Sequence, residues 1–595
     1  MSEFTGSVFF DPDNKQYPGA APACAVSAWR GQGWVALAGR LDDRQSLADA
    51  LGLPPGESFS DSLLAARALE RWGNDAPRHL LGDFALAAWH GPERQLILAG
   101  DAMCMRTIYY WRDRDRVIFS TSLPGLLAVP DVPRVVNELF VVDFLAQNFG
   151  DDDATFYRDI YKLDPGACLM LTAGGKSSRP FHCFDPERRI RFKRDQDYVD
   201  RARELLDRAV ADRLREGPAA IMGSGGLDSA CLAVAVLPHV ATLPFLTMLP
   251  EPGQPCPPAP GYIDETPFVA ALAAAFPALR AEFITPPAQS EWGPDNWRLL
   301  TAGAIPYRMP DQIAWLDAPA RRAAALGATH YLTGAIGNHT LTWDGLRYLP
   351  MLFQQRRWPT LLRELLLTSR GQPRALAGLI KNQLYLALRQ PRFDEATLLA
   401  TCGLKPSILR NFDMMGRLRQ RGNDPDFRLA VDGRAWRIAA IRRNRARRAD
   451  GMNMLRAYQG IGNSAPLGDL RLVEFCLAIP EDQYLRDGDT RWLARRLLRQ
   501  AGVPAKITEN RQRGRQHPEW FAHMQRVRPS LPAQLDRLRR SATASRLLDL
   551  DRLERLINDW PKDAVTAETR RDQVQVLLQG AFSVGAFIAW VEGTN

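Results

Sequence analysis

A glycine-rich turn between an apolar run and a helix-like run constrains the fold of this chain more than any other feature. The apolar run 219–222 ends at Ser224, Gly225 and Gly226, and a helix-like run over 229–237 follows. Strand, glycine-rich turn and helix in this order aim backbone N–H groups and the positive end of a helix at phosphate. Glycine lets the backbone approach an anion closely. The pattern therefore predicts a phosphate-binding loop at the end of a strand.

Asp228 lies inside this loop. Its expected use is to hold an Mg²⁺ ion that bridges phosphate oxygens. The loop lacks the Gly-Lys-Ser/Thr ending of the ordinary P-loop, so a different nucleotide-binding loop is indicated. A tight turn with a helix cap is the structural alternative. The motif Ser-Gly-Gly-Leu-Asp-Ser over 224–229 resembles the pyrophosphate-binding loop of ATP pyrophosphatases, which form AMP and pyrophosphate.

The composition is that of a soluble globular protein. At ~150 residues per domain, 595 residues allow roughly two to four domains. The start of the chain has no signal pattern, and no apolar run reaches the ~18 residues of a membrane span. Eight scattered cysteines without a Cys-x-x-Cys pair predict buried thiols rather than a zinc site. We therefore expect a cytoplasmic protein with no integral membrane span.

The net charge of +9 has a local source. The segment 434–448 carries seven arginines and no acid. A solvated helix face is one interpretation, and a surface for phosphate, an acidic peptide or anionic lipid is the other. Nucleic acid is not an expected partner, because no recognisable reading motif accompanies the arginines.

The pattern of elements predicts an α/β protein with two parts. Residues 1–185 contain short apolar runs with turn punctuation, which indicate a layered sheet. Residues 195–595 begin with strands that alternate with helices, which is typical of a parallel sheet, and the chain is predicted to be almost wholly helical from about 350. In the second part we expect strands at 241–249, 281–285 and 329–333, and helices at 196–216, 264–275, 311–326, 471–478, 489–501, 545–557 and 570–591.

This order of parts resembles the asparagine synthetase superfamily, class B type, over nearly the whole chain. The segments 39–44, 81–89 and 101–110 are similar to the family's glutaminase domain. The resemblance implies an α+β sandwich of the Ntn-hydrolase type, followed by an ATP-pyrophosphatase domain with a helical C-terminal region. It also implies ATP and Mg²⁺ as cofactors.

The N-terminus departs from the family. Glutaminases of this type begin Met-Cys-Gly-Ile, whereas this chain begins Met1-Ser2-Glu3-Phe4. Serine is a far weaker nucleophile than cysteine at neutral pH, so we expect no glutaminase activity, and we expect Cys24 to be a core residue. The same loss occurs in family members that use no ammonia, including β-lactam-forming synthetases and lasso-peptide cyclases.

Three more segments are similar to the synthetase domain. In 331–339, Asn338 stands where the family has an Asp that holds Mg²⁺, and Asp344 is either a substitute or a turn residue. Asp469 matches a family acid, and a helix N-cap is its alternative role. Arg513 stands at the position of a family lysine that stabilises the adenylate. The resemblance thus assigns catalysis to Asp228, Asp469 and Arg513, and the metal to Asp228 and Asn338. The nucleotide-binding residues are expected to be Met222, Gly223, Ser224, Gly225, Gly226, Leu227, Ser229, Thr247, Gly334 and Ala335.

The resemblance implies an AMP-forming amide ligase, most like a lasso-peptide cyclase that joins a peptide N-terminus to an Asp or Glu side chain. Its substrate would be a peptide or a small carboxylate, and a precursor-peptide protease and a leader-binding protein would be its partners. An asparagine synthetase or another ligase that uses ammonia or a small amine is the alternative. A non-catalytic binding scaffold is a third reading. Tyr348 and Glu364 are unranked candidates for the general base.

Overall fold

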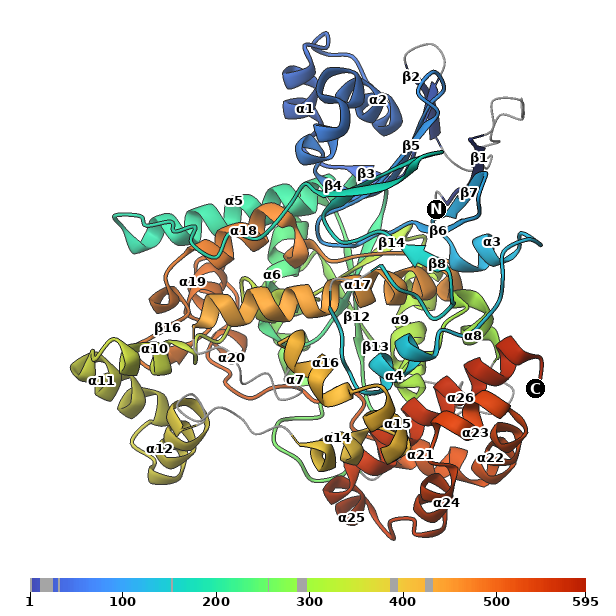
Figure 1. The fold of residues 1–595 in the computed structure, drawn as a ribbon. Coiled ribbons are helices and arrows are strands. Elements are labelled where there is room, and N and C mark those ends of the chain that lie inside the picture. The colour runs from blue at the N-terminus through green and yellow to red at the C-terminus, as the bar shows by residue number, and fades with distance from the viewer. Residues whose placement is uncertain are drawn as a thin grey trace.

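The computed structural model places a β-sandwich on a larger part built around a parallel sheet and many helices (Figure 1). The fold class is therefore the α/β arrangement that the sequence predicts, with the helices concentrated in the C-terminal half. Cys24 lies outside the described residues. The structure describes residues 3–10, 25–29, 33–150, 153–254, 256–285, 297–385, 394–422 and 432–594.

Two antiparallel sheets form the N-terminal sandwich. The four-stranded sheet has the order β1-β7-β6-β8, and the six-stranded sheet has the order β10-β9-β5-β4-β3-β2. Side chains alternate along each strand: Ala36 and Ala38 face the other sheet, whereas Val35 and Leu37 pack under α1 (Arg44–Leu51) and α2 (Asp61–Trp72). The strands are β1 Thr5–Phe9, β2 Ala25–Trp29, β3 Gly33–Leu41, β4 Gly82–His90, β5 Gln95–Gly100, β6 Tyr109–Arg112, β7 Arg116–Ser120, β8 Ile160–Lys162, β9 Ala167–Thr172 and β10 Gly175–Pro180.

A five-stranded parallel sheet, in the order β13-β12-β11-β14-β15, forms the centre of the second part. Helices cover both of its faces, as the alternation of strands and helices predicts. Its last strand, β15, was not predicted, because it joins the sheet from more than a hundred residues downstream of β14. The strands are β11 Ala219–Gly223, β12 Leu243–Met248, β13 Leu279–Ile284, β14 His330–Thr333 and β15 Gly462–Ser464. The covering helices are α5 Asp195–Leu214, α6 Leu227–Val236, α7 Thr266–Ala275, α9 Ile313–Ala325 and α19 Trp492–Gln500.

The C-terminal half is helical, with two differences from the prediction. The predicted helix 489–501 starts later, because a short hairpin of β16 (Leu485–Arg486) and β17 (Asp489–Thr490) precedes it. The predicted helix 545–557 is two helices, with Asp549 capping the second. The further helices are α3 Leu123–Leu127, α4 Glu138–Leu145, α8 Trp297–Gly303, α10 Tyr348–Gln354, α11 Trp358–Ser369, α12 Pro373–Leu379, α14 Glu395–Thr401, α15 Pro406–Asn411, α16 Met414–Gln420, α17 Gly433–Gln459, α18 Leu470–Ala478, α20 Ala505–Thr508, α21 Trp520–Val527, α22 Leu531–Arg540, α23 Ala542–Leu547, α24 Leu550–Asn558, α25 Ala564–Thr569 and α26 Leu578–Glu592.

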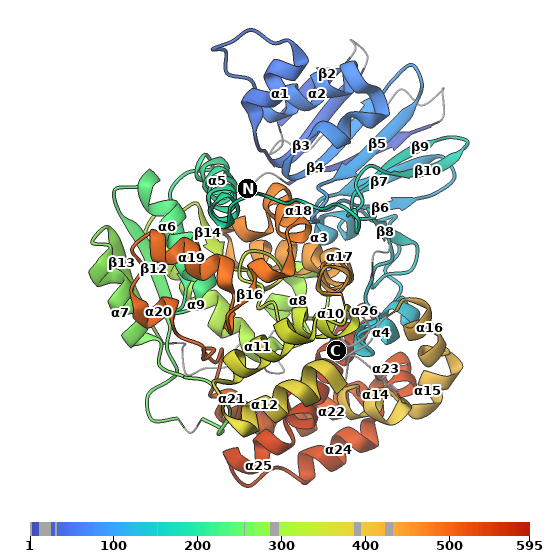
Figure 2. The same cartoon turned by 90° about the vertical axis from the view of Figure 1, so that its left-hand side faces the viewer.

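The sandwich and the C-terminal helices share one hydrophobic core. Tyr109 and Ile118 of the four-stranded sheet belong to the same buried cluster as Phe582 and Phe587 of α26. Figure 2 shows the sandwich lying directly over the second part. Among the described residues, Asp572–Glu592 is the one helix long and apolar enough to cross a membrane, and 72% of its most apolar window is buried inside the protein.

The arginine-rich segment lies on α17, which runs through the middle of the molecule (Figure 1). A solvated helix face is wrong for four of its arginines, because neighbouring elements bury them. Arg437 is fully buried and donates to Glu481 at 2.7 Å and to the Cys476 carbonyl at 2.8 Å. The other buried members are Arg434, Arg443 and Arg445.

Candidate functional site

The predicted phosphate-binding loop joins β11 to α6, and two serines hold its shape. The Ser224 backbone N–H donates to Ser229 Oγ at 3.0 Å, and the two hydroxyl oxygens are 3.2 Å apart. Gly226 is the N-cap of α6. A side chain at Gly223 would place its Cβ 2.2 Å from the Phe245 ring, so the strand can end only in glycine here.

The other predicted nucleotide-binding residues gather at the same edge of the sheet. Thr247 is the β12 partner of Gly223, and its buried Oγ1 has no hydrogen-bond partner among the described residues. Gly334 and Ala335 follow β14 directly. The carboxyl ends of adjacent parallel strands are where ligands bind in sheets of this kind, so these residues surround one location.

Asp228 is packed between the loop and the segment after β14. Its Oδ1 accepts a hydrogen bond from Thr342 Oγ1 at 2.5 Å. A Cβ at Gly337 would lie 1.8 Å from Oδ1, so glycine is required beside this carboxylate. Burial raises the pKa of Asp228, and the Thr342 hydrogen bond and the charges of Arg491 and Arg513 only partly offset this.

Two arginines face Asp228. Arg513 Nη2 lies 3.5 Å from Asp344 Oδ2, and Arg491 Nη2 donates to Asn338 Oδ1 at 3.1 Å. Asp344 Oδ1 accepts from the Leu346 backbone at 3.0 Å, so Asp344 has the turn role and also faces the site. Sequence reasoning missed Arg491, whose left-handed backbone (φ 58°) caps α19. The Asp-Gly turn just before β17 is the local signal that marks a break there.

Glu265 is a second site residue that the sequence analysis did not predict, and it links the segment around Arg513 to the phosphate-binding loop. The Arg515 backbone donates to the Tyr262 carbonyl at 2.9 Å, and the Tyr262 backbone donates to the Arg513 carbonyl at 3.2 Å. Three residues further on, Glu265 Oε2 accepts from the Gly225 backbone N–H at 2.7 Å. Burial raises the pKa of Glu265. This carboxylate therefore occupies a loop N–H group of the kind that binds phosphate.

The residues fit an Mg²⁺ ion through Asp228 rather than through Asn338. Asp228 is a partly buried carboxylate beside the phosphate-binding loop, and carboxylate together with phosphate oxygens is the ligand set that Mg²⁺ takes in nucleotide sites. The Asn338 oxygen accepts from Arg491, so a cation already faces it. Within the described ranges, no group of three or more His, Cys, Asp or Glu side chains forms a metal cluster. Phosphate oxygens would therefore have to complete the coordination shell.

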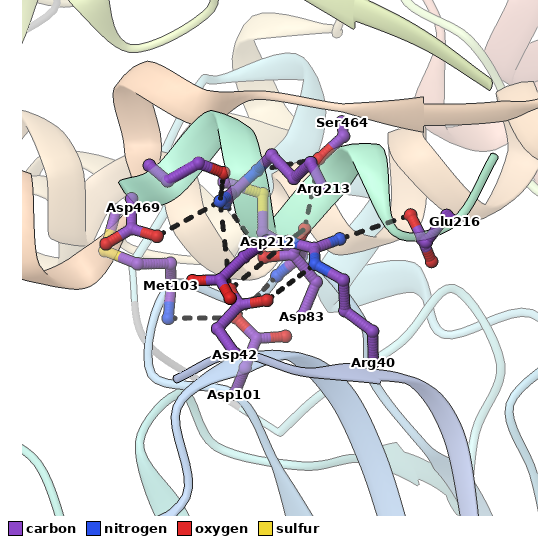
Figure 3. Close-up of polar contacts among 12 residues, drawn as sticks. Arg40, Asp42, Asp83, Asp101, Met103, Asp212, Arg213, Glu216, Ser464 and Asp469 are labelled. Carbon is purple, nitrogen blue, oxygen red and sulfur yellow. Dashed lines mark hydrogen bonds and ion pairs between the residues drawn. The ribbon is translucent and has the colours of Figure 1, made fainter. Parts of the chain in front are cut away.

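Asp469 lies in a different cluster, between the sandwich and the second part (Figure 3). Its Oδ1 caps α18 by accepting from the Arg471 backbone at 3.1 Å, and its Oδ2 lies 3.1 Å from Arg213 Nη1. Arg213 also lies 3.5 Å from Asp83, which pairs with Arg40 at 2.8 Å. The structure therefore gives Asp469 the N-cap role, and its catalytic role stays a prediction.

The two candidates for the general base lie behind the Arg491 turn. Glu364 accepts hydrogen bonds from the backbones of Asp487 at 3.0 Å and Gly488 at 2.9 Å. Tyr348 packs in the same small core as Leu485. Both side chains support the hairpin that precedes Arg491.

Two family profiles match the chain. The asparagine synthase profile matches residues 201–592, and the glutamine amidotransferase domain profile matches residues 28–182. The site described above, from Ser224 to Arg513, falls inside the first match.

Relatives are similar over parts of the chain. A Bacillus subtilis protein named asparagine synthetase [glutamine-hydrolyzing] 3 is 23% identical over 31% of this chain and 30% of its own length. A putative asparagine synthetase 2 from Methanocaldococcus jannaschii is 23% identical over 36% and 41% of the two chains. Amidase chry2 of Gibberella zeae is 28% identical over 29% and 26%. The matches thus span well under half of these relatives.

A solved structure of glutamine PRPP amidotransferase from B. subtilis, with ADP and GMP, aligns with 37% of this chain and 47% of its own at a TM-score of 0.20 and 17% identity. The family assignment depends on the profile instead, because it covers about two thirds of the chain and contains the loop, Asp228, Asn338 and Arg513. The chain belongs to the asparagine synthase family.

Proposed function

We propose that this protein is an ATP-dependent carbon–nitrogen ligase that activates a carboxylate as an acyl-adenylate and transfers the acyl group to an amine. The observation that carries the proposal is the meeting of the 224–229 loop, Asp228, Arg491 and Arg513 at one edge of the parallel sheet. The division of the chain into a glutaminase-like part, 1–185, and a synthetase part, 195–595, belongs to the same proposal.

Each residue has a role that follows from its place. Backbone N–H groups of the loop and the N-terminus of α6 hold the departing pyrophosphate. Mg²⁺, when bound with ATP at Asp228, would neutralise phosphate charge. Arg491 and Arg513 stabilise the charge that develops as the carboxylate attacks the α-phosphate. Arg513 keeps its charge at all relevant pH values, so it stabilises charge and does not shuttle a proton.

Our preferred subclass is a lasso-peptide cyclase, which closes an isopeptide bond between a peptide N-terminus and an Asp or Glu side chain. Holding the amine and the acyl-adenylate in one molecule makes the second step effectively unimolecular. An asparagine synthetase, or a ligase for ammonia or a small amine, is the second candidate, and the names of two relatives favour it. The reaction would take place in the cytoplasm, where ATP is available.

We further infer that the N-terminal part does not hydrolyse glutamine. The chain has Ser2 where glutaminases of this type have their nucleophilic cysteine, and serine is a far weaker nucleophile at neutral pH. Release of glutamate from glutamine above that of a heat-killed sample would contradict this inference.

The experiment that tests the ligase is isotope exchange between ATP and pyrophosphate, with and without a candidate substrate. We expect exchange that depends on the substrate and on Mg²⁺. Mass spectrometry then separates the subclasses: a cyclase yields a product one water lighter than its peptide and one AMP per ring, whereas an ammonia-dependent ligase turns a carboxylate into an amide. Absence of exchange with peptides, amino acids and other carboxylates would favour the non-catalytic scaffold.

A further inference from the structure

A cavity of about 720 Å³ lies beside the candidate site, between α4, α17 and the loop that precedes α9. Its volume falls in the range of about 300–1,000 Å³ that organic ligands occupy. Ile336 and His339 line it, and they lie on either side of Gly337, which packs against Asp228. The cavity is therefore next to the proposed adenylation site, and none of the contacts described above uses it.

The charges that line the cavity are not balanced. Lys162 pairs with Asp450 at 2.6 Å, and Asp143 pairs with Arg417 at 2.5 Å, which leaves Asp572 as the acid outside these pairs. Among the described residues, no hydrogen bond or ion pair joins the lining arginines to an acid, and two of them have a buried Nη1 without any partner. The lining arginines, called the cavity arginines below, are Arg308, Arg447 and Arg448.

The surrounding protein lowers the pKa values of the cavity arginines. Burial lowers the pKa of Arg308 to about 10 and that of Arg448 to about 10, and it also lowers the pKa of Arg447. The Arg447 side chain is exposed, so a ligand that enters the cavity can reach it. Two of these partly enclosed arginines have a buried Nη1 without a partner, so an anion in the cavity would stabilise them.

Phenylalanines form part of the cavity wall. Phe140 and Phe156 pack edge to face with ring centres 4.8 Å apart, and Phe144 contacts Phe156 in the same way at 5.1 Å. The Arg447 guanidinium lies 4.5 Å above the ring of Phe149. The cavity thus offers both an apolar wall and cationic groups, and the two meet where Arg447 lies over Phe149.

We propose that this cavity binds an acidic peptide segment, with its carboxylates on the cavity arginines and its apolar side chains against the phenylalanine wall. The proposal rests on the ligase function above and names its substrate class. A free amino acid would leave most of the cavity unfilled, whereas several linked residues would contact both the phenylalanines and the cavity arginines. Bound in this way, the peptide would have one carboxylate close to Gly337 and the adenylation site.

The test measures binding by fluorescence anisotropy, without ATP. The probe is a labelled peptide that carries two glutamates and two phenylalanines, and its matched control replaces both glutamates with glutamine. We expect the acidic peptide to bind at least ~10-fold more tightly than the neutral one. Replacing Arg447→Gln together with Arg448→Gln should weaken the acidic peptide at least ~10-fold and leave the neutral one unchanged. Arg442→Gln, an exposed arginine of the same helix outside the cavity, should have no effect.

Several results would overturn the proposal. One is equal affinity of the double variant and the original protein for the acidic peptide, and another is equal competition by free aspartate. Binding to phosphatidylserine vesicles with no binding of peptide would point to lipid headgroups instead. If the double variant does not fold, Arg308→Gln carries the same prediction. Removal of an uncompensated charge should also raise the melting temperature of the ligand-free protein, and a lower one would count against the proposal.

The design separates this proposal from the ligase. If the acidic peptide binds as described but ATP–pyrophosphate exchange is absent with every substrate, the ligase function fails and the peptide site stands. If exchange occurs with a peptide that the double variant binds equally well, the cavity proposal fails and the ligase stands.

Discussion

Asp469 is a buried carboxylate with two arginines in direct contact, whereas Asp228 is a partly buried carboxylate whose arginines contact other side chains. Asp469 contacts Arg213 and Arg471 directly, and although its burial alone would raise the pKa, these partners outweigh it and lower the pKa. Asp228 has a hydrogen bond from Thr342, but its arginines, Arg491 and Arg513, contact neighbouring side chains, and its pKa is raised.

We propose that the difference separates a carboxylate that stabilises the fold, Asp469, from one that is held ready for a ligand, Asp228. A carboxylate whose charge is already matched has little to gain from a metal ion, and removing it leaves buried arginines without a partner. A carboxylate whose charge is only partly matched is stabilised further when a cation arrives. Family resemblance places both acids at functional positions, and only the surroundings distinguish their roles.

The largest effect on stability is expected for Asp469→Ala. The variant removes the nearest carboxylate from buried Arg213, which keeps only the more distant Asp83 and Asp42, so the free energy of unfolding should fall by up to about 3–5 kcal/mol. Urea denaturation measures the change. Asp212→Ala is the matched control, since Asp212 pairs with Arg471 at the edge of the same network, and it should cost clearly less. An equal loss of unfolding free energy in the two variants would show that Asp469 contributes no more to stability than Asp212.

Asp228→Asn should abolish turnover and spare the fold. ATP–pyrophosphate exchange is expected to fall at least ~10²-fold, as on loss of one preorganised charge contact. Because burial raises the pKa of Asp228, its ionised form destabilises the ligand-free protein, so the variant should melt at a higher temperature at neutral pH. Asp344→Asn serves as the control and should reduce exchange less. Normal exchange by Asp228→Asn would remove the metal assignment.

Variants of Arg513 test whether a positive charge without a fixed geometry is sufficient at this site. Its side chain is 71% exposed, so Arg513→Lys keeps the charge without needing a fixed geometry and should retain most of the exchange rate. Arg513→Ala should lose roughly tenfold, which corresponds to about 1.4 kcal/mol of transition-state stabilisation. If the lysine variant lost as much as the alanine variant, Arg513 would have to bind substrate through a specific guanidinium geometry.

The pKa values of Asp228 and Asp469 predict a pH range in which exchange activity is lost while the protein stays folded. The pKa of Asp228 lies above the ordinary value of 3.8, so exchange should decline on acidification before that pH is reached. The pKa of Asp469 lies below 3.8, so its contribution to stability is full above 3.8 and is lost only as pH falls through its lowered pKa. Exchange rate and circular dichroism, followed between pH 7 and 3, should separate. Coincident loss of both signals would mean that unfolding alone causes the inactivation.

Much of the fold is readable from the sequence because it depends on local patterns. The short continuous apolar runs of β3, β4 and β5 and the strand–helix alternation after 195 are each contained in a short window. β15 is the exception, because its three residues join β14 only through a pairing across more than a hundred residues. No local pattern encodes that contact.

The residues of the candidate site also differ in whether a local sequence pattern reveals them. The 224–229 loop and Gly334 are recognisable from their motifs, and the structure brings them together around Asp228. Arg491 and Glu265 are not, because an arginine after a turn and a glutamate before a helix are ordinary residues until distant segments fold beside them. Asp469 shows the converse, since a motif position there serves as a helix cap in an ion-pair network.

The sheet that contains Tyr109 and Ile118 limits how this chain can be divided. On its outer face Tyr109 donates a hydrogen bond to Asp450 of α17 at 2.8 Å, and the buried cluster that begins there extends to Phe582 and Phe587 of α26. A cut near residue 190 would leave an apolar sheet face on one fragment and an uncovered helix on the other, and both surfaces would favour aggregation. We therefore expect the residues before 190 to act as part of the scaffold on which the rest of the chain folds.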